Sequence, residues 1–374
     1  MKFGIITHAV HKIKEKQIYS YEPYVREMNL WAKYVDEIVI VAPISNNNIE
    51  NIEKAYNHSN LRIFEISNFN ITSIKNIIKT LLVIPKICFS ILKIMKDVDH
   101  IHIRCPGNIG LLGCFIQVLF PSKPKTVKYA GNWDPNSRQP LSYRIQKWIL
   151  SNTFLTRNCK VLVYGHWKNQ SQNIIPFFTA SYKKNEIEVV RKKTFSSRII
   201  FMFVGAFSKG KQPFLSVKVV ENLYLKGVNV HLKMFGEGEE FLKIKEYISN
   251  NSLEKIITLY GNQPKNEVKH AYKTSHFLLF ISQSEGWPKV VAEAMFWRCL
   301  PISSNVSCVN SMLDYNNRGS VLKADITVNE VTSEVINYLE NENKYQEKVL
   351  NAFKWSQSYT LDKFETEIKN LLRN

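Results

Sequence analysis

Two glutamates, Glu285 and Glu293, are the side chains of this sequence best suited to hold a polar ligand. Glu285 lies in a Gly/Pro turn directly after the apolar run 276–281, which predicts a buried strand, and Glu293 lies early in the helix predicted next. In open α/β sheets, ligands bind at this rim because helix N-termini and loop amides converge there. Carboxylates at that rim can accept hydrogen bonds from neighbouring sugar hydroxyls. Glu293 needs such a partner to offset its desolvation in an apolar helix.

A second candidate ligand loop is VGAFSKGKQP at residues 204–213, which also follows a predicted strand and precedes a predicted helix. Gly205 and Gly210 allow the backbone to turn tightly, while Lys209 and Lys211 offer point charges to a phosphate. The alternative interpretation is a solvated basic loop.

A third glycine loop, FGEGEE at residues 235–240, places Gly236 and Gly238 after another predicted strand. A lone GxG is a weak signal, and the acidic side chains beside it would repel phosphate. We interpret this loop as a turn that lines a cleft and not as a dinucleotide fingerprint.

The sequence also contains two patterns that could hold a metal. Asp97-Val98-Asp99 has the form of a DxD motif but stands before a predicted strand instead of at its carboxyl end. His100 and His102 alternate onto one face of that strand, so they could form a ligand pair. Because no further ligand is evident, we expect packed or hydrogen-bonded histidines and no metal site.

The elements that must position these residues form two strand–helix series, which indicates two doubly wound parallel sheets. In the first series, strands are predicted at 3–7, 37–43, 61–66, 100–104, 126–130 and 160–164, and helices at 24–34, 74–95 and 110–120. In the second series, strands are predicted at 198–204, 230–235, 256–260, 277–281 and 300–303, and helices at 213–225, 239–250, 266–274 and 288–298.

We therefore expect an α/β protein of two Rossmann-like domains. The expected parts are an N-terminal domain at 1–178, a linker at 179–197, a C-terminal domain at 198–355, and a last helical segment at 356–374 that packs back toward the N-terminal domain.

Composition narrows the functional class without deciding it. The 374 residues include 50 Lys and Arg against 32 Asp and Glu, a formal net charge of +18 that attracts anions such as phosphorylated substrates, acidic lipids or nucleic acid. The six cysteines are scattered, which favours a reducing compartment, and no secretory segment follows Met1. We expect a cytoplasmic protein.

The predicted helix 74–95 raises the question of membrane contact. Lys75, Lys79, Lys86 and Lys93 fall on one stripe of an otherwise apolar helix, and these lysines argue against a transmembrane span. One interpretation is a basic amphipathic helix lying on anionic lipid at the inner face of the plasma membrane, and the other is a helix packed on the sheet with its lysines in water.

Four segments of the second series occur in the order and spacing of a known donor-binding domain: VGAFSKGKQP, FGEGEE, LYGNQPKNEVKHAY and SEGWPKVVAEAM. Over residues 198–320 the sequence resembles the retaining glycosyltransferases of family 4. Three N-terminal segments look similar to the same group: YEPYVREMNLWAKYVDEIVIVAP, HIRCPGNIG and KYAGNWDP. The resemblance implies a GT-B fold, with two Rossmann-like domains facing a cleft. It also implies sugar transfer from a nucleotide diphosphate sugar with retained anomeric configuration, without metal or other cofactor.

The resemblance also implies roles for individual residues. Glu285 and its loop should face the transferred sugar, Glu293 should accept from the ribose hydroxyls, and Lys211 should hold the diphosphate. The donor-binding residues expected on this basis are Gly205, Lys209, Lys211, Gly236, Gly238, Asn262, Glu285, Gly286, Trp287, Pro288, Lys289, Val290 and Glu293.

Two positions depart from the family pattern. Ala206 stands where the family usually has Arg, and no His follows the fifth N-terminal strand. Asn132 or Asp134 could replace that His, or His166 could approach from the next strand, so the catalytic candidates are Glu285, Asn132 and Asp134. The acceptor-binding candidates in the N-terminal domain are Tyr21, Arg104 and Asn108.

The leading hypothesis is transfer of a hexose-type sugar to a glycan or lipid-linked acceptor of a surface polysaccharide, with peripheral contact to anionic membrane and none to nucleic acid. A catalytically weakened homologue that acts as a scaffold is the alternative, suggested by Ala206 and the missing His. A basic nucleic-acid-binding protein is motivated only by charge. A nicotinamide dehydrogenase is disfavoured because no GxGxxG follows the first strand.

Overall fold

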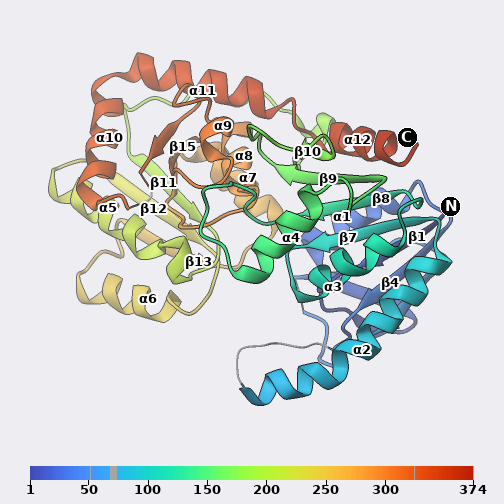
Figure 1. The fold of residues 1–374 in the computed structure, drawn as a ribbon. Coiled ribbons are helices and arrows are strands. Elements are labelled where there is room, and N and C mark those ends of the chain that lie inside the picture. The colour runs from blue at the N-terminus through green and yellow to red at the C-terminus, as the bar shows by residue number, and fades with distance from the viewer. Residues whose placement is uncertain (51, 68–73, 324, 374) are drawn as a thin grey trace. The chain divides into compact units, whose positions relative to one another are not determined.

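The computed structural model describes residues 1–50, 52–67, 74–323 and 325–373, which divide into two compact units (Figure 1). Unit 1 consists of Met1–Phe177 with Glu365–Asn374, and unit 2 of Phe178–Phe364. Each unit is built on its own parallel β-sheet with helices packed against it.

Unit 1 contains a seven-stranded parallel sheet with the strand order β10-β9-β8-β7-β1-β4-β6. Its strands are β1 (Lys2–Ile6), β4 (Glu37–Ala42), β6 (Leu61–Glu65), β7 (His100–Cys105), β8 (Lys125–Tyr129), β9 (Cys159–Tyr164) and β10 (Ile174–Phe177). The helices are α1 (Glu22–Ala32), α2 (Ile74–Asp97), α3 (Asn108–Ile116) and α4 (Leu141–Ser151). The 3-10 turn η1 (Gln117–Leu119) directly follows α3. Runs such as Glu37–Ala42 are nearly all Val and Ile because a parallel sheet is buried on both faces.

A small antiparallel sheet in unit 1 has no counterpart in the expected elements. It joins β2 (Lys12–Lys14), β3 (Gln17–Tyr21) and β5 (Glu53–Ala55). The β2–β3 hairpin turns at Glu15 and Lys16, which both have positive φ, the signature of a tight two-residue hairpin loop. Glu and Lys are uncommon at such positions, so the sequence carried no turn signal.

Unit 2 contains a six-stranded parallel sheet with the order β13-β12-β11-β14-β15-β16. Its strands are β11 (Ile199–Val204), β12 (Val230–Phe235), β13 (Ile257–Gly261), β14 (Phe277–Phe280), β15 (Leu300–Ser304) and β16 (Ser320–Leu322). The helices are α5 (Pro213–Leu225), α6 (Phe241–Asn250), α7 (Lys265–Thr274), α8 (Lys289–Phe296), α9 (Val309–Met312), α10 (Val328–Glu340) and α11 (Glu342–Ser356), with 3-10 turns η2 (Lys184–Glu186) and η3 (Lys209–Lys211). The prediction of two Rossmann-like parallel sheets is confirmed.

Several elements were not anticipated, among them α4, β10, β16, α10 and α11. The start of α10 had a readable signal, since Thr327 and Glu330 form a capping box in which Glu330 N donates to Thr327 Oγ1 at 3.3 Å. α11 begins directly after Asn341, whose side chain caps it.

Residues 179–197, expected as a linker, belong to unit 2. Lys193 fixes this segment, because its Nζ lies 2.6 to 3.0 Å from four backbone carbonyl oxygens, which share its three N–H donors. Those carbonyls belong to Tyr272, Ser275, Trp297 and Arg298, close to the ends of α7 and α8. A charged segment that reads as a linker is therefore tied down by helix C-terminal carbonyls.

The last helix is α12 (Leu361–Arg373). Its residues up to Phe364 belong to unit 2, and those from Glu365 onward belong to unit 1. At its start, Leu361 N donates to Tyr182 O at 2.8 Å. Further along, Glu365 accepts from Lys33 Nζ at 2.8 Å and from Tyr34 OH at 2.9 Å. None of the helices in the described ranges combines the length and apolar character needed to cross a membrane.

Candidate functional site

The loops after β11 and β12 pack backbone against backbone at the carboxyl edge of the unit 2 sheet. Gly236 has φ +123°, and a Cβ there would lie 2.0 Å from the carbonyl oxygen of Gly205. Gly238 is restricted in the same way, because its Cβ would lie 2.7 Å from the carbonyl oxygen of Phe207. Glycine is therefore required at both positions for the backbone to approach this closely. The structure supports the interpretation of FGEGEE as a turn.

The structure brings together Lys211 and Glu285, which are 74 residues apart. Lys211 ends the turn η3 between β11 and α5, and Glu285 lies in the loop between β14 and α8. Lys211 Nζ forms an ion pair with Glu285 Oε1, which also accepts from Ser282 Oγ at 2.6 Å. The lysine ammonium has three N–H donors, so it can hold Glu285 and a phosphate at the same time. This pair is suited to a ligand with an anionic group next to hydroxyls.

The Glu285 loop is anchored on both sides by polar contacts that the sequence analysis did not identify. Ser282 N donates to Ser304 Oγ at 3.0 Å, and Ser304 Oγ donates back to Ser282 O at 2.5 Å. Gln283 N donates to Gly210 O at 2.8 Å, which joins the Glu285 loop to the Lys211 loop. Ser282 and Ser304 each come directly after a predicted strand. This position at the sheet edge was the only sequence feature that could have identified them. The anchoring holds Glu285 in place before a ligand arrives.

The predicted residues after Glu285 lead into the N-terminus of α8. Gly286 is fixed through its carbonyl, which accepts from Ser307 Oγ at 2.8 Å. Pro288 precedes the helix and Lys289 is its first residue, so the positive end of the helix dipole lies directly after the Glu285 loop. Val290 occupies the next position. First-turn amides at this place can bind a diphosphate.

The Trp287 side chain packs within unit 2. Its ring centroid lies 6.0 Å from that of Tyr359 and 6.4 Å from that of Phe178. The structure therefore gives this indole a packing role, while its backbone remains part of the loop beside the helix N-terminus.

Glu293 is held by partners within the protein. Its Oε1 accepts from Ser181 Oγ, and its Oε2 accepts from Tyr272 OH at 3.3 Å. Burial and the neighbouring carboxylate raise the pKa of Tyr272 well above its usual value. The inference that Glu293 needs a ligand to offset its desolvation was wrong, because Ser181 and Tyr272 already supply hydrogen bonds. Glu293 also lines a small pocket with Ser181 and Lys289.

The remaining donor candidates lie at the same sheet edge. Asn262 is exposed directly after β13, and Gly236 N donates to Gly261 O at 2.8 Å, which joins the β12 and β13 loops. Lys209 is exposed at the start of η3. Tyr260 stacks on Phe235 with centroids 4.7 Å apart.

The catalytic candidates of unit 1, Asn132 and Asp134, stabilise their own loop after β8. Asn132 Oδ1 accepts from Asp134 N at 2.9 Å, and Asp134 Oδ1 accepts from Asn136 N at 2.9 Å. Such contacts are typical of Asx turns. Lys147 Nζ donates to Asp134 O at 3.1 Å, and burial lowers the pKa of Lys147 to about 8. His166 is exposed after β9, the neighbour of β8.

Among the acceptor candidates, Arg104 is engaged inside the protein. Its guanidinium pairs with Glu27 Oε1 at 3.1 Å and lies 5.5 Å above the ring centre of Tyr24. Tyr21 is 55% exposed at the end of β3, and Asn108 is half-buried at the first position of α3. Only Tyr21 thus presents a largely exposed side chain.

The sequence analysis missed the histidines near Arg104. His11 Nε2 lies 2.9 Å from Tyr56 OH, and burial lowers the pKa of His11 to about 4. The pKa of His8 is also lowered, by desolvation and then by the Arg104 charge. Their position just after β1, at the sheet edge, was the signal that could have identified them.

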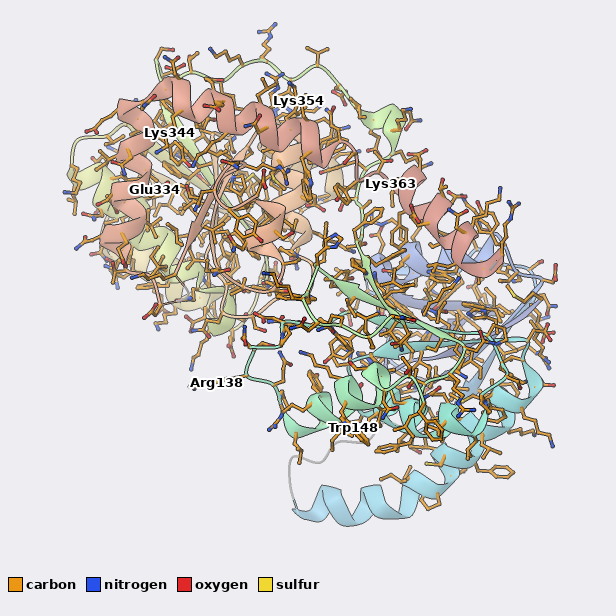
Figure 2. All side chains as sticks on the ribbon, turned by 45° about the horizontal axis from the view of Figure 1, so that its top comes forward. Arg138, Trp148, Glu334, Lys344, Lys354 and Lys363 are labelled. Atoms are coloured by element: carbon orange, nitrogen blue, oxygen red, sulfur yellow. The ribbon has the colours of Figure 1, made fainter. Side chains whose placement is uncertain are left out.

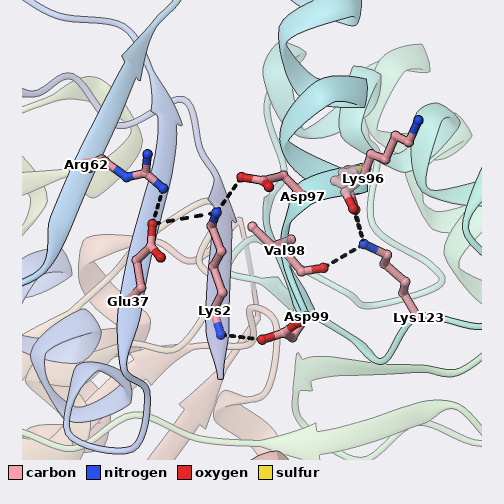
Figure 3. A network of polar contacts seen from close by, with 9 residues as sticks. Lys2, Glu37, Arg62, Lys96, Asp97, Val98, Asp99 and Lys123 are labelled. Carbon is pink, nitrogen blue, oxygen red and sulfur yellow. Dashed lines mark hydrogen bonds and ion pairs between the residues drawn. The ribbon is translucent and has the colours of Figure 1, made fainter.

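The DxD pattern lies in a charged network at the amino edge of the unit 1 sheet (Figure 3). Asp97 forms an ion pair with Lys2 Nζ, and Asp99 Oδ2 accepts from Lys2 N at 2.7 Å. Lys123 caps the end of α2, donating to carbonyls that include Val98 O at 2.7 Å. Within the described ranges, no group of three or more His, Cys, Asp or Glu is placed to hold a metal ion.

The expectation that His100 and His102 are packed and hydrogen-bonded is confirmed. His100 Nε2 and His102 Nδ1 each lie 2.9 Å from Thr126 Oγ1. Both rings stack on Phe3 in the core. Burial lowers the pKa of His100 to about 4, so the neutral form predominates at neutral pH.

Comparison with known proteins shows which proteins this chain resembles. Residues 185–355 match the family "Glycosyl transferases group 1". The chain is 25% identical over 235 residues to the capsular polysaccharide biosynthesis glycosyltransferase CapH of Staphylococcus aureus, covering 58% of this chain and 63% of CapH. The chain therefore spans somewhat less than two thirds of this curated relative.

Two solved structures have a fold similar to that of this chain over its whole length. Sucrose-phosphate synthase from Thermosynechococcus elongatus superposes with a TM-score of 0.67 at 14% identity, covering 100% of this chain and 98% of that one. Anabaena HepE, in complex with UDP and glucose, gives a TM-score of 0.66 at 11% identity, covering 100% and 99%. The chain thus has the GT-B fold, and residues 185–355 match the group 1 glycosyltransferase family. The predicted resemblance is confirmed at this level.

Proposed function

We propose that this chain is a retaining, metal-independent glycosyltransferase of family 4. It would move a hexose-type sugar from a nucleotide diphosphate sugar to a glycan or lipid-linked acceptor of a surface polysaccharide. The single observation that carries the proposal is the ion pair between Lys211 and Glu285 beside the N-terminus of α8. A cation, a carboxylate and helix amides at one sheet edge match a diphosphate bonded to a polyhydroxylated ring.

The names of similar proteins support the class of substrate. CapH is named for capsular polysaccharide biosynthesis, and HepE was solved with UDP and glucose. By this analogy the donor is a UDP-sugar or a close relative, and the enzyme works at the cytoplasmic face of the membrane.

In the proposed reaction, the bond between the anomeric carbon and the diphosphate oxygen breaks as an acceptor hydroxyl bonds to that carbon on the same face. Lys211 and the α8 amides stabilise the departing diphosphate, whose oxygen takes the acceptor proton. No protein nucleophile is then needed. Glu285 accepts hydrogen bonds from the sugar hydroxyls and orients the ring, while Glu293 accepts from the ribose.

A thermal-shift screen with UDP, GDP, ADP and their sugars tests the proposal. A nucleotide at 100 times its dissociation constant should raise the free energy of unfolding by about 2.7 kcal/mol. Lys211→Ala should abolish the shift, and Lys226→Ala, at an exposed position after α5, is the matched control. If no nucleotide stabilises the wild-type protein, the proposal is wrong.

A binding protein without transfer activity is the second candidate. It is favoured by the Asx turns of Asn132 and Asp134, which engage one oxygen of each predicted catalytic side chain. Such a protein would show the nucleotide shift but would release no nucleoside diphosphate in the presence of acceptor glycans. Product analysis by mass spectrometry separates the two candidates.

A further inference from the structure

The strand order of both parallel sheets reverses at one point. In unit 2, β12 and β13 follow β11 on one side, and β14, β15 and β16 lie on its other side. In unit 1, β4 and β6 lie on one side of β1, and β7 to β10 lie on the other (Figure 1). Ligands of open α/β sheets bind at such switch points, outside the carboxyl ends of the strands. Lys211 and Glu285 lie there in unit 2, so the loops after β1 and β7 are the corresponding place in unit 1.

His8 lies at the switch point of unit 1. It follows β1 after Thr7, and its ring packs on Gly107 in the loop between β7 and α3. A Cβ added at Gly107 would lie 2.7 Å from His8 Nδ1, so a larger side chain there would displace the imidazole. His8 is exposed, and within the ranges that the structure describes no protein group forms a hydrogen bond with its ring. Its ring nitrogens are therefore available to a ligand.

The loop that carries His8 is held in place before any ligand binds. The ring of His11 fixes it from one side, because its Nδ1 lies 2.8 Å from Ala9 O. Strand β3 fixes it from another side, because Ser20 Oγ donates to Val10 O at 2.8 Å. A preorganised loop positions an imidazole without a large loss of conformational freedom when the ligand arrives.

The remaining histidines of unit 1 do not stand at this point. Most of them form contacts within the protein, namely His11, His58, His100 and His102. His166 is exposed, but it follows β9, which is separated from β1 by β8 and β7. His8 is thus the imidazole that the fold places at the switch point of unit 1.

The surroundings of His8 favour a ligand with hydroxyl groups. Desolvation and, to a smaller extent, the Arg104 charge lower the pKa of His8, so its imidazole is neutral at neutral pH. A neutral imidazole has one N–H donor and one acceptor nitrogen, which matches a hydroxyl group that both donates and accepts. The Arg104 guanidinium already pairs with Glu27 Oε1 at 3.1 Å. This place is therefore better suited to a sugar than to a phosphate.

Two further side chains suited to a sugar flank the His8 loop. Asn108 directly follows Gly107 and begins α3. Tyr21 directly follows Ser20, which is bonded to the His8 loop, and Tyr21 is 55% exposed. An aromatic ring can cover the apolar face of a sugar ring, while an amide and an imidazole bind its hydroxyl groups.

We infer that His8 is a specificity-determining residue that hydrogen-bonds a hydroxyl group of a neutral acceptor sugar, beside Tyr21 and Asn108. The inference rests on the proposed function, since this sugar would be the terminal unit of the acceptor glycan. His8 takes the place of Arg104 among the predicted acceptor-binding residues. It receives no proton in the transfer step, because the departing diphosphate oxygen takes that proton. Its contribution is to orient the acceptor sugar.

Saturation-transfer NMR with the full-length protein tests the inference without a donor. The probes are the methyl glycosides of glucose, galactose, mannose and N-acetylglucosamine. We expect at least one of them to receive saturation from the wild-type protein and to shift the Cε1–H signal of His8 in protein labelled at the histidine Cε1. The His8→Ala variant identifies that signal. The signals of exposed His166 and His270 should stay in place.

Substitutions test the contribution of each side chain. His8→Ala should weaken glycoside binding about tenfold, as expected for loss of a hydrogen bond, while His8→Asn keeps a donor and an acceptor and should lose less. Tyr21→Ala should weaken binding several-fold, and its control is Tyr224→Ala, a tyrosine of unit 2 with a similar exposure of 51%. Arg138→Gln, at an exposed position in the loop after β8 (Figure 2), should bind the glycoside as wild type.

Three outcomes would overturn the inference. The first is a wild-type protein that binds none of the glycosides. The second is a His8→Ala variant that binds as well as wild type, or a His166 signal that moves in place of the His8 signal. The third is inorganic phosphate that displaces the glycoside and shifts the His8 signal at constant pH, which would assign the place to an anion.

Two measurements separate this inference from folding defects and from the proposed function. An unchanged melting temperature shows that His8→Ala is folded. The nucleotide-induced thermal shift depends on unit 2 and should be the same in His8→Ala as in wild type. If no nucleotide stabilises either protein, the proposed function fails, while glycoside binding at His8 is still measured.

Discussion

The carboxyl edges of the two sheets use their polar side chains differently. In unit 1, Arg104 pairs with buried Glu27, and Asn132 and Asp134 accept hydrogen bonds from backbone amides of their own loop. In unit 2, Lys211 and Glu285 meet across two loops, and the lysine side chain remains 29% exposed. The first arrangement stabilises the fold, while the second leaves donors and acceptors that a ligand can use. Substitutions should therefore cost folding stability at the first edge and ligand binding at the second.

The strongest test of this comparison is Glu27→Ala in unit 1. It leaves the Arg104 charge, whose side chain is 15% exposed, without its partner. Loss of one member of a buried pair should lower the free energy of unfolding by about 3–5 kcal/mol, measured by chemical denaturation. The control is Lys33→Met, which breaks the more exposed pair with Glu365 and should cost under about 1 kcal/mol. Equal effects of the two variants would contradict a structural role for Arg104.

The next test is Lys211→Ala in unit 2, where the expected loss is in ligand stabilisation. Transfer should fall by about 10²–10³-fold, as for removal of one preorganised charge-stabilising group. The free energy of unfolding should change by no more than about 1 kcal/mol, since the lysine is partly exposed. If Lys211→Ala instead lowers the free energy of unfolding strongly while the folded variant keeps full turnover, Lys211 has a structural role and not a ligand-binding one.

Glu285→Gln and Glu293→Ala should have smaller and separable effects. Glu285→Gln should reduce turnover about tenfold or more while nucleotide affinity is largely kept, because this side chain is expected to hold the sugar. Glu293→Ala should instead weaken nucleotide binding. Since Ser181 and Tyr272 donate to Glu293, Ser181→Ala is the matched control that disturbs the carboxylate without removing it. If both glutamate variants bind nucleotide as wild type does, the ribose role of Glu293 is wrong.

Periodicity was sufficient to predict most strands of both sheets, because parallel strands such as β4 and β14 are short continuous apolar runs. The meeting of Lys211 with Glu285 could be expected only through family resemblance, since it depends on which loops the topology makes neighbours. Contacts such as Ser181 with Glu293 could not be predicted, because the charged composition of residues 179–197 reads as a linker. Likewise, nothing in the local sequence shows that Glu27 neutralises Arg104.

The last expected effect concerns pH and involves several buried histidines, most of them in unit 1. Burial lowers the pKa of His100 and of His11 to about 4, and that of His102 falls well below its usual value of 6.5. The unfolded chain therefore binds protons at these sites before the folded chain does, so stability holds above pH 6.5 and falls as pH drops from 6.5 toward 4. Thermal denaturation between pH 7.5 and 4.5 should show this loss.

The substitution His100→Asn removes one titrating group while leaving an amide that can hydrogen-bond Thr126, so it should flatten the pH dependence of the free energy of unfolding. His270→Asn, at an exposed position of unit 2, should leave the slope unchanged. Burial also lowers the pKa of His276, in unit 2, to about 4, so both units should lose stability in acid, and His100→Asn measures only a part that belongs to unit 1. If both substitutions change the slope equally, buried histidines of unit 1 do not govern its acid sensitivity.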